Sequence, residues 1–81
     1  MKIPKPLIKW CTKDAEQGHA YAQTMLGYFY ENGTNVTQDL MQAVKWFTKA
    51  AEQGFSEAQY RLGSMYKNGY GVAQDYKQAV K

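Results

Sequence analysis

Residues 9–45 of this chain read KWCTKDAEQGHAYAQTMLGYFYENGTNVTQDLMQAVK, and residues 45–81 repeat that stretch as KWFTKAAEQGFSEAQYRLGSMYKNGYGVAQDYKQAVK. A shift of 36 positions aligns the two copies, and 22 of the 37 aligned pairs are identical. Because unrelated segments would match at about two or three positions, the repetition is not chance. Each copy therefore predicts one structural unit of a repeat array.

The first half of each unit predicts a helix that ends at a glycine. These helices are expected over residues 19–32 and 56–68, where each reaches an Asn-Gly pair. Gly33 and Gly69 can take the left-handed backbone conformation that terminates a helix. His19 stands where the first of these helices begins, which favours a capping or surface role over a catalytic one.

The second half of the unit predicts an amphipathic helix over residues 39–53. Asp39 can cap its N-terminus, and Gln42 at the third helical position completes a capping-box-like pair that Asp75 and Gln78 repeat. The apolar residues follow the spacing i, i+3, i+4, i+7, i+10 and i+11, which places them on one helical stripe. They are Leu40, Ala43, Val44, Phe47, Ala50 and Ala51.

The repeat organises the whole chain as a single all-α domain over residues 1–81. A partial unit (1–18) holds a shorter copy of the second helix, and a full repeat (19–54) and a truncated repeat (55–81) follow it. No run of alternating polar and apolar residues is long enough to predict a strand. Because repeat arrays usually need about three units and polar caps, the open ends are expected to favour end-to-end association.

Composition narrows the classes of partner and site. The net charge is +3, and the nine Lys and one Arg are spread along the chain, which disfavours nucleic-acid binding. No stretch approaches the roughly 20 apolar residues of a membrane span. Cys11 is the only cysteine, so neither an internal disulfide nor a zinc site is expected, and no cofactor is predicted. Without a signal peptide the default is the cytoplasm, with a trimmed secreted or periplasmic fragment as the alternative.

The recurring residues resemble the Sel1-like repeat family, which is related to the tetratricopeptide repeats. The second unit carries the family pattern at Ala58, Gln59, Leu62, Gly63, Tyr66, Gly69, Gly71, Val72 and Asp75. The first unit carries it at Ala22, Gln23, Leu26, Gly27, Tyr30, Gly33, Val36, Asp39, Ala43, Trp46, Lys49, Ala50, Ala51, Glu52, Gln53 and Gly54. One departure is Asn35 in place of the second glycine, and Asn tolerates left-handed geometry.

This resemblance implies a right-handed α/α superhelix, a solenoid of about two helix-turn-helix repeats plus the preceding partial helix. It also implies a non-enzymatic scaffold that binds a protein or peptide partner. Related repeats line their concave groove with the first helix of each unit. The partner itself is not identified by the resemblance.

The two copies of the first helix differ on one face only. The positions that recur cluster on one half of the helical wheel and predict the packing face, and the positions that differ predict the opposite face. Tyr and Arg, the residue types that dominate binding hot spots, are among the differing ones. Neutral drift on a solvated face is the alternative interpretation. The candidate partner-binding residues are Tyr21, Thr24, Met25, Tyr28, Glu57, Tyr60, Arg61 and Ser64.

Two other functions compete with the protein-binding scaffold. One is self-assembly, in which open solenoid ends pair into a homo-oligomer. The other is a weak β-lactam-binding hydrolase, because some cysteine-rich members of the resembled family are linked to β-lactam binding or turnover. Those members carry paired cysteines in each unit, whereas this chain has Cys11 alone. No Ser, Asp or second His stands at a spacing that indicates a catalytic triad, so no catalytic residue is predicted.

Overall fold

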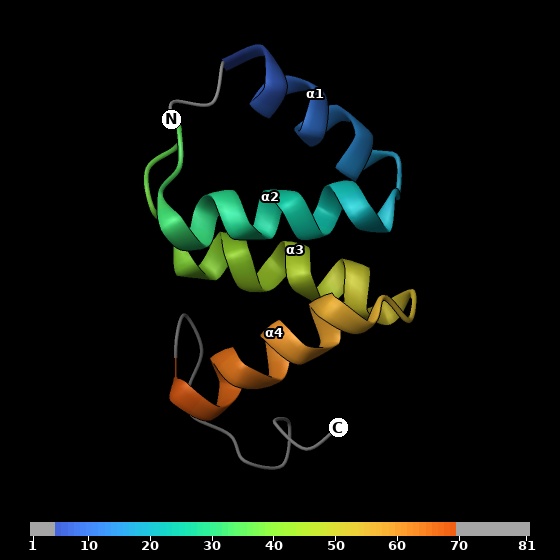
Figure 1. Cartoon of the computed structure of the whole chain (residues 1–81), viewed down its shortest axis with the longest axis vertical. Coiled ribbons are helices and arrows are strands. Elements are labelled where there is room, and N and C mark those ends of the chain that lie inside the picture. Colours follow the sequence, from blue (N-terminus) through green and yellow to red (C-terminus); the bar gives the residue numbers. More distant parts are fainter. Residues whose placement is uncertain (1–4, 70–81) are drawn as a thin grey trace.

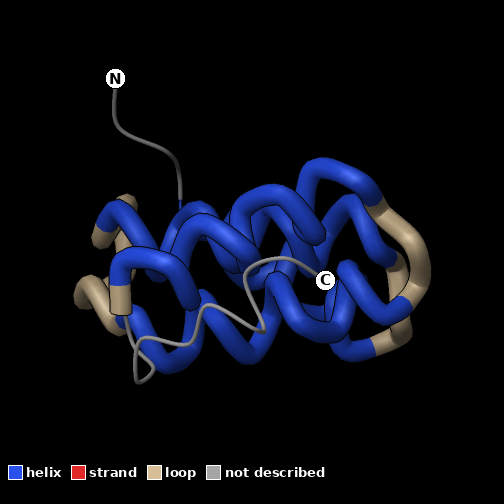
Figure 2. The backbone as a smooth tube through the Cα atoms, turned by 90° about the horizontal axis from the view of Figure 1, so that it is seen from below, coloured by secondary structure: helices blue, strands red, loops and turns tan. Residues whose placement is uncertain are grey.

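Four helices form where the internal repeat predicts them. The computed structural model describes residues 5–69, and within that range it contains no strand. The helices are α1 (Lys5–Glu16), α2 (Ala20–Asn32), α3 (Leu40–Glu52) and α4 (Ser56–Asn68). They stack in chain order from α1 to α4 (Figure 1), and the short connections gather at the two ends of the stack (Figure 2). The predicted all-α repeat architecture is confirmed.

The helix ends follow the predicted sequence rules. Gly33 and Gly69 end α2 and α4 in the left-handed region, with φ of 69° and 72°. The carboxylate of Asp39 caps α3 by accepting a hydrogen bond from the backbone N–H of Gln42 at 3.1 Å. The return half of the capping box is replaced by a different bond, because the backbone N–H of Asp39 donates to the carbonyl of Tyr30 at 2.9 Å.

Two further expectations concern the starts of elements. His19 occupies the N-cap position of α2, but its side chain makes no capping hydrogen bond. Asn35 has a φ of 57°, so the tolerance of Asn for left-handed geometry at this loop position is confirmed. The second copy of the cap, at Asp75 and Gln78, lies outside the described residues.

The helix α3 supplies side chains to both parts of the core. Its Trp46 belongs to a buried cluster with α1 and α2 that contains Ala15, Ala22, Leu26 and Phe29. On its other side, α3 contributes to a second buried cluster, which α4 completes. That cluster contains Ala43, Val44, Phe47, Ala50, Ala58 and Met65. The repeats are therefore joined through α3, which each cluster uses on a different face.

The closest approach of two helices is at Gly27 of α2. A Cβ atom at this position would lie 2.8 Å from ring carbons of Phe47 in α3, closer than side chains normally come. The Phe47 ring is fully buried, and the ring of Tyr28 packs against it edge to face with centroids 5.2 Å apart. The absence of a side chain at Gly27 thus sets how near α2 and α3 can lie.

A buried amide pair ties the first three helices together. The Gln23 side chain is buried, and its Nε2 donates to the carbonyl of Ala15 at the end of α1 at 3.0 Å. Its Oε1 accepts a hydrogen bond of 2.9 Å from Nε2 of Gln53, which also donates to the carbonyl of Gly18 at 2.8 Å. Because unpaired buried amides are costly, these bonds fix α1, α2 and the end of α3 in one arrangement.

A methyl group at Gly27 should destabilise the fold despite improving helix propensity. Gly27→Ala gains up to about 1 kcal/mol of helix propensity, but it forces the Phe47 ring aside, and overpacking of this kind costs about 1–3 kcal/mol. We expect a net loss of unfolding free energy, measured by urea denaturation. Adding Phe47→Leu should make the Gly27→Ala step less costly. An unchanged or higher midpoint in the single variant would contradict the close contact.

Candidate interaction surface

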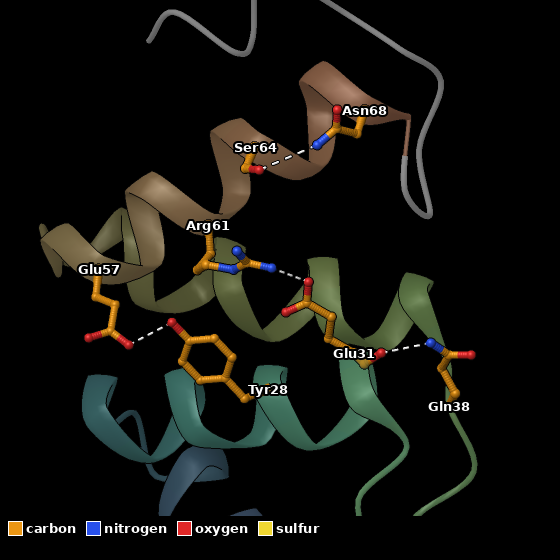
Figure 3. A network of polar contacts seen from close by, with 7 residues as sticks. All are labelled: Tyr28, Glu31, Gln38, Glu57, Arg61, Ser64 and Asn68. Carbon is orange, nitrogen blue, oxygen red and sulfur yellow. Dashed lines mark hydrogen bonds and ion pairs between the residues drawn. The ribbon is translucent and has the colours of Figure 1, made fainter.

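The first helices of the two repeats, α2 and α4, are joined by a network of polar side chains (Figure 3). The hydroxyl of Tyr28 donates a hydrogen bond of 2.6 Å to the carboxylate of Glu57. One turn along α2, the carboxylate of Glu31 forms an ion pair with the guanidinium of Arg61. These four residues, which we call the α2–α4 seam, connect positions 29 and 30 residues apart in the sequence.

The environment of the seam holds its members in defined states. The guanidinium carbon of Arg61 lies 5.8 Å from the ring centroid of Tyr28, within the range of a cation–π interaction. Burial, reinforced by the bond to Glu57, raises the pKa of Tyr28 to about 12, so its hydroxyl remains a donor at neutral pH. The Nε of Arg61 is buried, and no acceptor for it exists among residues 5–69.

Two of the predicted contact residues are strongly exposed. The side chain of Tyr21 is 68% exposed, and that of Tyr60 is 74% exposed. The Tyr21 ring meets the ring of Phe55 at a centroid distance of 6.3 Å and an angle of 65°, so one edge of it is supported from the start of α4. Ser64 is half-buried and accepts a hydrogen bond from the side chain of Asn68 at 3.4 Å.

The other predicted residues do not share one exposed face. Thr24 is only 2% exposed, and its hydroxyl donates to the carbonyl of Ala20 at 2.9 Å. Met25 is half-buried and packs against the core cluster around Trp46. The helical wheel placed both opposite the packing face, but their environment in the folded chain is packed. Tyr28, Glu57 and Arg61 are brought together, as members of the seam.

Sequence reasoning left two residues out of the candidate set that the structure places beside it. Glu31 pairs with Arg61, and Phe55 supports Tyr21. Both stand at positions where the two repeats differ, Glu31 against Lys67 and Phe55 against His19. Difference between the copies therefore indicates them. It does not indicate which residue on the neighbouring helix each would contact.

The family model described as Sel1 repeat matches residues 20–55 and again 56–81. The chain belongs to the Sel1 repeat family. Proteins of this family generally mediate protein–protein interactions, and the fold is typically a non-catalytic scaffold. None of the curated proteins compared with the chain matches it.

Solved Sel1-type structures superpose closely on this one. A protective antigen of uropathogenic Escherichia coli with an SLR fold is 52% identical over 90% of the chain, with a TM-score of 0.85. A Sel1 repeat protein of Oxalobacter formigenes is 38% identical over 89% (TM-score 0.86), and Helicobacter pylori cysteine rich protein B is 34% identical over 96% (TM-score 0.91). The chain spans 16%, 21% and 59% of those three chains, respectively.

Other kinds of site find little support among the described residues. No group of three or more His, Cys, Asp or Glu side chains within residues 5–69 is placed to hold a metal ion. In the same range no helix is long and apolar enough to cross a membrane. Burial, and secondarily the charge of Asp14, raises the pKa of the Cys11 thiol. A thiol of this kind is a poor nucleophile near neutral pH and packs as a small apolar side chain.

Reversing the charges of the seam should reveal its coupling. Glu31→Arg and Arg61→Glu each oppose like charges at a partly buried contact, and each should lower the unfolding free energy by about 1–3 kcal/mol. The double reversal restores an ion pair, so it should be less destabilising than the sum of the single changes by at least about 0.5 kcal/mol. Urea denaturation of the four proteins measures this cycle. Additive single effects would show that the pair is not coupled.

Proposed function

We propose that this chain is a scaffold segment that binds a protein or peptide partner over the exposed faces of α2 and α4. The observation that carries the proposal is the exposure of two tyrosines, Tyr21 at 68% and Tyr60 at 74%, at positions where the repeats differ. Isolated exposed aromatics of this size are unusual unless they serve contacts. Tyrosine is also among the residue types that most often anchor a protein interface.

The α2–α4 seam gives this surface a defined shape. The Tyr28 hydroxyl and the Arg61 guanidinium are each held by a carboxylate of the neighbouring repeat. Because these side chains are already ordered, a partner that contacts them loses less conformational entropy on binding. We therefore infer that the partner meets Tyr21 and Tyr60 as anchors, with Tyr28, Arg61, Glu57 and Ser64 as the polar surroundings and Thr24 and Met25 as support beneath.

The seam also bears on the self-assembly alternative. Position 28 of one repeat meets position 57 of the next, which corresponds to Tyr21, and position 31 meets position 61, which corresponds to Met25. A second copy stacked on α4 in the same geometry would bring Ser64 to Tyr21 and Lys67 to Met25. Such a junction would not reproduce the ion pair of the seam, so binding of a different partner is favoured over head-to-tail pairing.

The hydrolase alternative gains no support from the described residues. The raised pKa of Cys11 disfavours its thiolate as a nucleophile, and the described range offers no metal-holding cluster. The 34% identity with cysteine rich protein B of Helicobacter pylori reflects the shared repeat fold. A scaffold role agrees with the usual role of the family.

Removing the two exposed tyrosines should abolish partner capture while leaving the fold intact. We expect the double variant Tyr21→Ala, Tyr60→Ala to capture partners from the source cell with at least about tenfold lower yield, because truncating an anchoring Tyr costs about 2 kcal/mol. Quantitative mass spectrometry of captured proteins measures the effect, and thermal unfolding verifies the fold.

The matched control is Met41→Ala, because Met41 is a large apolar side chain that is 72% exposed but lies on α3. It should capture the same partners as the unaltered chain. If the double tyrosine variant captures them equally well, or if Met41→Ala loses them as completely, the proposed surface is wrong.

A further inference from the structure

A groove between α3 and α4 has the same lining as a site that is already filled elsewhere in the chain. Its walls are formed by Thr48 and Ala51 of α3 and by residues of α4 that include Gln59, Leu62 and Gly63. Tyr66 completes the lining. Every one of these six residues is identical to the residue 36 positions earlier, and those counterparts are Thr12, Ala15, Gln23, Leu26, Gly27 and Tyr30.

The earlier copy of the lining holds the aromatic side chains of α3. The Phe47 ring lies directly against Gly27, where even one added carbon would meet it at 2.8 Å. The neighbouring Trp46 packs in the buried cluster that contains Leu26. A lining of this composition therefore accepts adjacent Trp and Phe side chains from a helix laid across it.

The earlier copy also holds a glutamine at the end of the same helix. The Nε2 of Gln53 donates to Oε1 of Gln23 at 2.9 Å and to the carbonyl of Gly18 at 2.8 Å. Gln23 presents its Oε1 in this direction because its own Nε2 is fixed on the carbonyl of Ala15 at 3.0 Å. The filled site thus combines an apolar cradle with two acceptors for one side-chain amide.

The groove between α3 and α4 keeps both acceptors in the same arrangement. The Nε2 of Gln59 donates to the carbonyl of Ala51 at 3.2 Å, as Gln23 does to Ala15. The carbonyl of Gly54 corresponds to that of Gly18, and both glycines have a left-handed φ, 83° and 95° respectively. Gln59 is exposed where Gln23 is buried, and within residues 5–69 no donor faces its Oε1. The acceptors are in place, but the helix that would use them is not among the described residues.

We propose that this groove binds an amphipathic helix of another protein that carries the pattern of α3. The pattern is an adjacent Trp and Phe, followed by Ala three residues and Gln six residues after the Phe, as in Trp46, Phe47, Ala50 and Gln53. The chain contains one Trp-Phe pair, and it is already buried in the chain's own core. The ligand helix is therefore supplied by a different molecule.

A second copy of this chain fits the groove less well than such a helix. The helix α1 aligns with α3 and presents Trp10, which is 65% exposed, at the position of Trp46. It has Cys11 at the Phe47 position, which would leave the space beside Gly63 underfilled. It also has Asp14 at the position of the fully buried Ala50, where a carboxylate would lose its hydration without a partner.

This inference goes beyond the proposed function and does not depend on it. The groove uses residues 59, 62, 63 and 66 of α4, whereas the proposed partner surface uses residues 57, 60, 61 and 64. On a helix these two sets occupy different faces. A ligand in the groove and a partner on the exposed tyrosines would therefore be distinguished by separate variants.

Titration of a synthetic peptide onto the 81-residue chain tests the groove directly. The peptide has the sequence of residues 39–54, carries a fluorophore at its N-terminus, and is followed by fluorescence anisotropy. We expect saturable 1:1 binding. Phe47→Ala in the peptide should weaken it roughly 10- to 100-fold, as the burial of an aromatic ring requires, and Gln53→Ala about fivefold through the lost hydrogen bonds. Met41→Ala in the peptide, at a position exposed in α3, should change nothing.

Variants of the chain locate the binding. Gly63→Leu fills the cradle and should weaken binding at least about tenfold, whereas Lys13→Leu, which adds the same side chain to the exposed surface of α1, should not. Gln59→Ala should weaken binding of the unaltered peptide but not of the Gln53→Ala peptide. The proposal is overturned if the peptide does not saturate the chain or if Gly63→Leu binds it normally. It is likewise overturned if the chain instead self-associates with concentration and Trp10→Ala abolishes that association.

Discussion

The fold of this chain depends on the absence of a side chain at Gly27. The ring of Phe47 occupies the space where a Cβ atom would stand, so α2 and α3 approach more closely than side chains on both helices would permit. This approach brings Trp46 on one side of α3 into the cluster with α1 and α2, and leaves the other side of α3 for α4. Both halves of the core are therefore arranged around one helix pair.

The same contact separates positions that must recur from those that need not. Gly27 and Gln23 face α3 and return as Gly63 and Gln59, because each unit has to receive the next helix in the same way. The seam follows the other rule. Tyr28 and Glu31 meet residues of α4 that differ from their own counterparts, so the junction between these two units has its own chemistry. A Sel1 scaffold can thus keep one packing scheme while varying the surface that it offers to partners.

Much of this arrangement could be predicted from the sequence, because local rules and the repeat act over short distances. The glycine ends at Gly33 and Gly69, the cap at Asp39 and the bounds of α4 follow from residue type and spacing alone. The environment of Thr24 could not be predicted, because a helical wheel gives direction but not the neighbours that bury a side chain. The pairing of Glu31 with Arg61 was also missed, since it depends on how α2 and α4 are placed by the helix between them.

Native-state hydrogen exchange is the most direct test of the claim that the α2–α3 pair supports the rest of the structure. If it does, the slowest amides will lie in α2 and α3, around Gly27 and Phe47, and will exchange only through global unfolding. Amides of α1 and α4 will exchange at lower free energy, because each of these helices packs on one side of that pair. Protection that is equal in all four helices, or greatest in α1 or α4, would contradict the account.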